Sequence, residues 1–180
     1  MTRRPPRTVV TLVVAALVAV LAGYGLYWYA PWTRVFDTTV NDPLTARYRY
    51  SAPEPDPTHT TDTSPYRLLS GTFVSQQHKT SGTVRIIRVP QEHSIRLELV
   101  DLDTSNGPDL QVWLSDQPVK ADKSAWRAFA TGPRVELGTL KGNKGNQAYE
   151  VPAYADLTPP LSVVIWSGRH DVAYGAAALN

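Results

Sequence analysis

The chain has 180 residues, no cysteine and a formal net charge of +2. The lack of cysteine excludes disulfides, thiol catalysis and iron–sulfur ligation by this chain alone. Three of the 18 cationic residues, Arg3, Arg4 and Arg7, lie at the N-terminus, and without them 15 basic side chains face 16 acidic ones. Because no later block combines Lys or Arg with aromatic residues, no nucleic-acid partner is expected.

Residues 9–30 are predicted to form a transmembrane anchor. Positions 9–29 carry no charge and no proline, and a helix of this length spans about 30 Å, the thickness of a bilayer's hydrocarbon core. The preceding arginines place residues 1–8 in the cytoplasm, and aromatic residues crowd the far end, where they favour the interface. A signal peptide cleaved after Ala22 is the alternative. In both cases the rest of the chain is expected outside the cytoplasm, with the lipid bilayer as a partner if the anchor is retained.

Residues 31–67 are predicted to be a membrane-proximal segment and a Pro/Thr-rich linker. Residues 51–65 contain four prolines and no aliphatic side chain larger than Ala. Such a stretch cannot bury enough apolar surface to offset its ordering entropy, so we expect a semi-extended spacer.

From Leu68 onward, short apolar segments alternate with turn residues. Ile95, Leu97 and Leu99 alternate with other side chains, which is the period-two pattern of a half-buried strand. A helical turn is possible only at 120–130, before Gly132 and Pro133. The pattern predicts a mainly β domain over residues 68–180, an antiparallel sandwich or barrel. Its expected strands are 68–75, 82–89, 94–101, 109–115, 134–137, 148–151, 161–167 and 172–175.

Two loops have the composition of ligand-binding motifs. Residues 101–107 (DLDTSNG) are rich in oxygen ligands, but they lack the Gly and Glu that an EF-hand loop needs. We interpret them as a tight connection in which Asn106-Gly107 supply positive φ. Residues 141–146 (KGNKGN) are basic and Gly-rich, but a strand follows them where a phosphate loop would open a helix. A hairpin turn is the prediction there.

The apolar strand 161–167 ends at Ser167, and the end of a rigid core strand is a good position for a reactive side chain. Ser167, His170 and Asp171 are the residue types of a nucleophilic triad, but such close neighbours on one turn seldom reach mutual hydrogen-bond geometry. The sequence also lacks a Gly-x-Ser-x-Gly elbow. A hydrolase is therefore disfavoured, and no catalytic residue, metal ligand or cofactor is predicted.

Four segments together resemble the DM-thirteen domain, an extracellular β-domain of electron-transfer type, over residues 68–180. They are Gly71-Thr-Phe73 followed by His78 and Ser81-Gly82; the segment 104–114, which contains Gly-Pro-Asp-Leu; the segment 137–152, which contains Lys-Gly-Asn-Lys-Gly-Asn; and 163–166 followed by 174–179. The resemblance implies the β fold and the exported location. The family's proposed redox role rests on a cysteine directly after the Ile-Trp pair, where this chain has Ser167. His78 and Asp109 match family motif positions.

The leading hypothesis is a non-catalytic, membrane-anchored extracytoplasmic domain that binds a cell-envelope protein or ligand. The alternative is a redox accessory domain that holds a metal or cofactor without cysteine, through His78, His93 or His170. The candidate functional positions are His78, Asp109, Trp166, Ser167 and His170.

Overall fold

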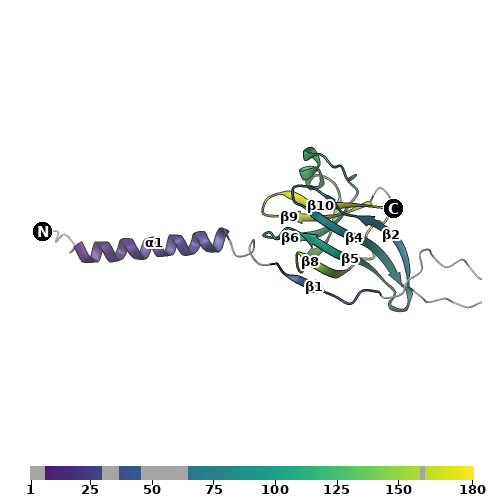
Figure 1. Cartoon of the computed structure of the whole chain (residues 1–180), viewed down its shortest axis with the longest axis horizontal. Helices are drawn as coiled ribbons and strands as arrows, with labels where there is room; N and C mark the ends of the chain where they lie inside the picture. The colour runs from purple at the N-terminus through teal and green to yellow at the C-terminus, as the bar shows by residue number, and fades with distance from the viewer. Residues whose placement is uncertain (1–6, 30–36, 46–64, 159–160) are drawn as a thin grey trace, which may run out of the picture.

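The computed structural model describes residues 7–29, 37–45, 65–158 and 161–180, which form one helix at the N-terminal end and a β domain (Figure 1). Helix α1 runs from Arg7 to Tyr29, and the side chains described on it, at Thr8 and residues 11–25, are exposed. No helix within these described ranges is long and apolar enough to cross a membrane. The predicted transmembrane anchor over residues 9–30 is therefore not supported.

Two five-stranded sheets build the domain, in the strand orders β1-β8-β5-β4-β2 and β3-β10-β9-β6-β7. The strands are β1 (Thr39–Asn41), β2 (Tyr66–Thr72), β3 (Val74–Ser75), β4 (Thr80–Val89), β5 (Ser94–Thr104), β6 (Leu110–Ser115), β7 (Arg134–Thr139), β8 (Lys144–Glu150), β9 (Leu161–Ser167) and β10 (Val172–Leu179). The pairing is antiparallel except between β1 and β8, which run parallel. The predicted sandwich of antiparallel-rich sheets is confirmed.

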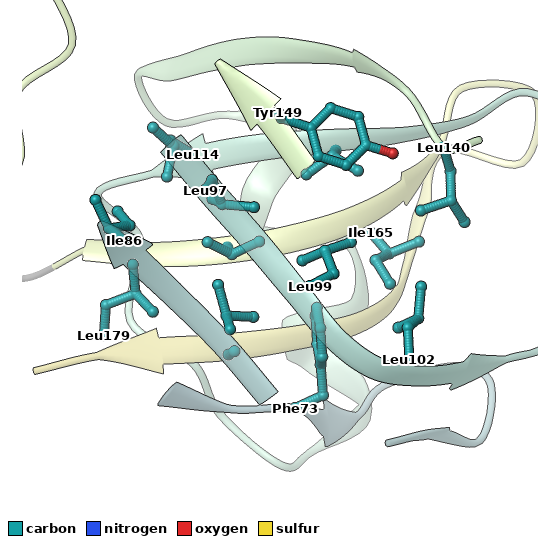
Figure 2. Packing of buried hydrophobic residues seen from close by; sticks show 14 of the residues in the cluster. Phe73, Ile86, Leu97, Leu99, Leu102, Leu114, Leu140, Tyr149, Ile165 and Leu179 are labelled. Carbon is teal, nitrogen blue, oxygen red and sulfur yellow. The ribbon is translucent and has the colours of Figure 1, made fainter. Parts of the chain in front are cut away.

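The main core lies between the two sheets (Figure 2). Alternate residues of the facing strands enter it, such as Ile86 and Leu97 from the first sheet and Leu114 and Ile165 from the second. This alternation is the reason for the period-two pattern of the sequence. The side chains between these positions lie on the other face of each sheet, where some, such as Ile87 and Val164, are also buried.

Strand β9 is buried along its whole length, as its apolar sequence predicts. On its second face, Val164 and Trp166 form a second apolar cluster with Phe129 of the short 3-10 helix η3 (Lys123–Ala130), which packs mainly on β10. Helix η3 lies where the sequence allows a helical turn. Burial on both faces makes β9 a rigid platform for Ser167 at its end.

Three features differ from the sequence-based expectation. The strand predicted at 68–75 is divided into β2 and β3, which belong to different sheets, with buried Phe73 between them. Strand β8 begins at Lys144, inside the segment predicted to be a hairpin turn. Strand β1 was not predicted, because its three residues show no apolar periodicity. Another 3-10 turn, η2 (Pro90–Glu92), connects β4 to β5.

Candidate functional site

The Gly-Pro-Asp loop, residues 105–109 between β5 and β6, lies at the centre of the candidate site. A Cβ added at Gly107 would overlap the Tyr174 hydroxyl, so only glycine fits at this position without displacing the loop or the ring. Tyr174 in turn stacks on His78, with ring centroids 3.8 Å apart and planes inclined by 25°. The prediction that Asn106-Gly107 supply positive φ is wrong, because the loop's left-handed residue is Asp109, with φ of 52°. Gly107 is needed for close approach.

Ser167 connects this loop to the turn that follows β9. Its side chain is fully buried, and its hydroxyl lies 3.1 Å from the Pro108 carbonyl oxygen and 3.3 Å from His170 Nδ1. Next to it, the Gly168 N–H donates to the Asp109 carbonyl at 3.0 Å. A Cβ at Gly168 would overlap the Asp109 carboxylate. The Gly-Pro-Asp loop and the turn 167–171 therefore form one hydrogen-bonded unit, which we call the loop pair.

The expectation that the triad residue types do not meet is wrong for Ser167 and His170. The turn brings the imidazole back over the serine, and the His170 backbone N–H also points at Ser167 Oγ, 3.4 Å away. The Asp171 N–H donates to the Ser167 carbonyl at 2.9 Å, which is the bond that closes the turn. Since Ser167 has no exposed surface, a substrate cannot reach its oxygen in this conformation. The contact organises the turn.

Trp166 belongs to an aromatic pair on the outer face of the second sheet. Its ring stacks on Trp113 with centroids 4.8 Å apart, and the Arg134 guanidinium lies 4.4 Å from the centroid of the Trp113 ring. Gln111 accepts a hydrogen bond from the Trp113 indole N–H at 3.0 Å and donates one to Asp109 at 3.2 Å. Asp109 is thus linked through Gln111 to the tryptophan pair.

A cleft of about 320 Å³ opens over this pair, which we call the tryptophan cleft. It is lined by Gln111, Trp113, Ala130, Arg134, Glu136, Trp166, Gly168 and Asp171. Arg134, Glu136 and Asp171 are the exposed charged residues of this lining, and the two indoles are almost fully buried beneath it. Gln111, Arg134 and Tyr174 were not among the functional positions predicted from the sequence. The available signal for Gln111 was its place between Asp109 and Trp113 on one face of a strand.

The Lys-Gly-Asn-Lys-Gly-Asn segment, residues 141–146, receives β1. Asn143 accepts a hydrogen bond from the Thr38 N–H at 2.7 Å and donates to Asp37 at 2.7 Å and to the Thr104 carbonyl at 3.0 Å. Cβ atoms at Gly142 and Gly145 would overlap the carbonyl oxygens of the incoming strand. The prediction of a plain hairpin turn is therefore wrong, because half of the motif is strand β8.

Two lysines of this motif hold carboxylates that flank β1. Lys144 lies 2.8 Å from Asp37, and Lys141 pairs with Asp42. The hydrogen bond from Lys144, aided by Asn143, holds the pKa of Asp37 below its usual value. Asp42 has a lowered pKa for the same reason, through Lys141 first and then the Ala148 N–H. The positive charges of Lys141 and Lys144 are therefore paired with carboxylates of the same chain.

The histidines of the sequence analysis lie in separate surroundings. His78 stacks on Tyr174, His170 contacts Ser167, and His93 follows the short helix η2 with a left-handed backbone. Within the described ranges, no three His, Asp or Glu side chains lie close enough together to hold a metal ion. The arrangement thus provides no support for a histidine-bound metal.

Comparison with known proteins agrees with this architecture. A family model described as Electron transfer DM13 matches residues 72–179, more than half of the chain. The match contains the loop pair, the tryptophan cleft and the 141–146 motif, while β1 lies before it. No curated protein and no solved structure gives a match. With both loops of the site inside the matched range, the chain belongs to the electron transfer DM13 family.

Proposed function

We propose that this domain is a non-catalytic binding module that contacts its partner or ligand through the loop pair and the adjoining tryptophan cleft. The observation that supports this most is the state of Ser167. At the position where the family resemblance implies a cysteine, the chain has a fully buried hydroxyl that is hydrogen-bonded to the Pro108 carbonyl. A serine cannot cycle between thiol and disulfide. The position keeps a structural role, and the accessible groups lie in the cleft beside it.

The tryptophan cleft has the composition of a recognition surface. Arginine is one of the residue types that most often dominate binding energy at interfaces, and Arg134 is exposed above the two buried indoles. Here Arg134 is held over Trp113 and also lies 3.3 Å from Glu136, so its guanidinium is already oriented. Pre-oriented groups lose less side-chain entropy on binding. A small polar ligand, or one polar side chain of a partner protein, fits this volume and lining.

Two measurements on the same chain test the proposal. In protein-film voltammetry the wild type is expected to show no reversible wave, while Ser167→Cys provides a matched thiol-bearing chain. A photo-reactive residue at Arg134 should form one specific adduct in the native envelope, and the same residue at exposed Lys79 should not. A reversible wave in the wild type, or equal adducts at both positions, would contradict the proposal.

A redox accessory role is the second candidate. It is favoured by the family match and by the stacked Trp113 and Trp166 rings directly before Ser167. Indole rings, like tyrosine phenols, can lose one electron in a chain without cysteine. This role predicts a one-electron wave that is lost in Trp113→Phe, with the fold retained in the far-ultraviolet circular dichroism spectrum.

We also propose that helix α1 associates with a lipid bilayer and that the β domain functions at the extracytoplasmic side. The support is the exposure of its large apolar side chains, such as Leu12 at 70% and Leu21 at 68%, since exposed apolar surface of this kind marks an interaction site. Liposome flotation of the full chain tests the first part, with Leu17→Asp/Leu21→Asp as the variant expected to remain unbound. Protection of the β domain from protease added to intact cells would contradict the second part.

A further inference from the structure

Strand β1 is a short edge strand of the first sheet, and no short loop connects it to a neighbouring strand. It pairs with β8 over three residues, Thr39 to Asn41, and both end residues are exposed. Its successor in the chain, β2, lies at the opposite edge of the same sheet. The family match begins only at residue 72. The β1 segment, residues 37–45, therefore lies before the matched region, as does all of β2 except its last residue.

The edge of β8 is nonetheless shaped to hold this segment. The Lys144 N–H donates to the Thr38 carbonyl at 3.2 Å, and the Asp42 N–H donates to the Asn146 carbonyl at 2.9 Å. Glu98, fully buried, accepts from the backbone N–H and the hydroxyl of Thr45 at 2.8 and 2.7 Å. Backbone pairing and side-chain bonds thus hold both ends of the segment.

Leaving this edge empty would be costly. Without the segment, Glu98 keeps only Arg85, at 2.6 Å, among these partners, and the buried Asn143 amide loses two of its bonds. Each buried polar group without a partner costs roughly 1–3 kcal/mol. The bare β8 edge would also expose unpaired backbone groups, which attract another strand. A β8 edge that loses its own segment is therefore expected to take an identical one.

The chain is long enough to supply that strand from another molecule. Twenty residues lie between Thr45 and Tyr66. The two strands they connect are four strand spacings apart, roughly 19 Å. Twenty residues can reach roughly 66 Å when extended. The connection therefore has far more reach than the intramolecular path needs, and it is long enough for the β1 segment to leave its own β8 edge for that of a second copy.

We propose that the β8 edge is a strand-acceptor site and that two copies of this chain exchange their β1 segments reciprocally. Reciprocal exchange gives a closed, two-fold symmetric dimer in which each acceptor keeps every contact described above. The donated segment also completes a small cavity of about 160 Å³ between the Gly-Pro-Asp loop and the 141–146 motif. Thr38 lines this cavity together with Asn106 and Lys141. The partner copy thus contributes a residue to this cavity. The inference is independent of the proposed ligand site at the tryptophan cleft.

The absence of cysteine allows a direct test on the full chain. Asp42→Cys in one tagged chain and Lys141→Cys in another place single thiols at the two ends of an existing contact. Mixed and mildly oxidised, they should form a disulfide-linked heterodimer severalfold more abundant than the collision control, Asp42→Cys with Lys79→Cys. The double variant Asp42→Cys/Lys141→Cys in one chain reports whether a disulfide can form between the two positions. A heterodimer yield equal to the collision control overturns the proposal.

A second variant tests exchange with both ion pairs intact. Gly145→Ala places a methyl group against the Val40 carbonyl and blocks the acceptor edge. Gly138→Ala is the matched control, because Gly138 also has positive φ but open space around its Cα. In analytical ultracentrifugation the wild type and Gly138→Ala should share a concentration-dependent dimer that Gly145→Ala loses. Dimerisation through helix α1 would persist in all three chains, and that result, or a monomeric wild type, refutes strand exchange.

Discussion

Replacing Asn143 by alanine should destabilise the domain much more than the same replacement at Asn146. Asn143 is 2% exposed and makes three side-chain hydrogen bonds. The variant leaves the Thr104 carbonyl, which belongs to a buried residue, without this donor, and it releases the Thr38 N–H. Asn146, the sister residue, makes one bond at the surface, to the Asp101 N–H at 2.9 Å.

The magnitude follows from these partners. Losing the donor to the buried carbonyl costs about 1–2 kcal/mol, and losing the acceptor of the Thr38 N–H adds about 1 kcal/mol. The bond to Asp37 counts for little, because that carboxylate is exposed and water replaces the amide. Asn143→Ala is thus expected to lower the free energy of unfolding by about 2–3 kcal/mol, which corresponds to roughly 10 °C in Tm for a domain of this size. For Asn146→Ala we expect less than about 1 kcal/mol.

Urea unfolding followed by tryptophan fluorescence measures both variants on the same chain. The midpoint should fall clearly for Asn143→Ala and barely for Asn146→Ala, with similar slopes. Equal losses in the two variants would show that the side-chain bonds of Asn143 do not hold β1 on the sheet, and the reasoning would fail.

Three further predictions concern titration and close packing. Burial raises the pKa of Tyr149 to about 12, against 10.0 for a free tyrosine. Between these values the phenol stays neutral in the folded protein and ionises in the unfolded one. Stability is therefore lost as the pH rises from about 10 to 12. An absorbance titration should show a late step near pH 12 that is missing in Tyr149→Phe. Gly107→Ala should cost about 1–3 kcal/mol by overpacking against Tyr174, and an unchanged unfolding midpoint would contradict the close approach. Because Lys141 lowers the pKa of Asp42, the contribution of this pair is complete above the ordinary value of 3.8 and is lost as the pH falls through the lower folded value. Hydrogen exchange should show that the Asp42 amide loses its protection in acid before the core does, and equal loss in both would contradict the assignment.

The strands of the sandwich were predictable because each has an apolar face that must be buried. Ile95, Leu97 and Leu99 alternate, and the β9 sequence is apolar on both faces because its second face is buried in the cluster that contains Phe129. Strand β1 was not predictable from such a pattern. Its three residues bury little, and it exists because Asn143, Lys141 and residues of β8 lie beside it in space.

For the site, the sequence indicated positions but not their roles. The family resemblance pointed to Asp109 and Ser167, and the structure places both in the loop pair. It could not reveal that Gly107 is required by the Tyr174 ring rather than by its own φ. Nor could it show that Arg134 covers Trp113, since that contact joins strands whose register is set only on folding.

The parallel pairing of β1 with β8 also has a mechanical meaning. A pull on the N-terminal helix reaches the domain first at β1, before it reaches the strands of the core. If β1 detaches, the twenty residues before Tyr66 come under tension and can extend from roughly 19 Å to roughly 66 Å. The first sheet loses only its edge strand in this step, and the strands from β2 to β10 stay paired. Under load, strand β1 is therefore expected to detach first. The distance between α1 and the domain then increases before any core strand unfolds.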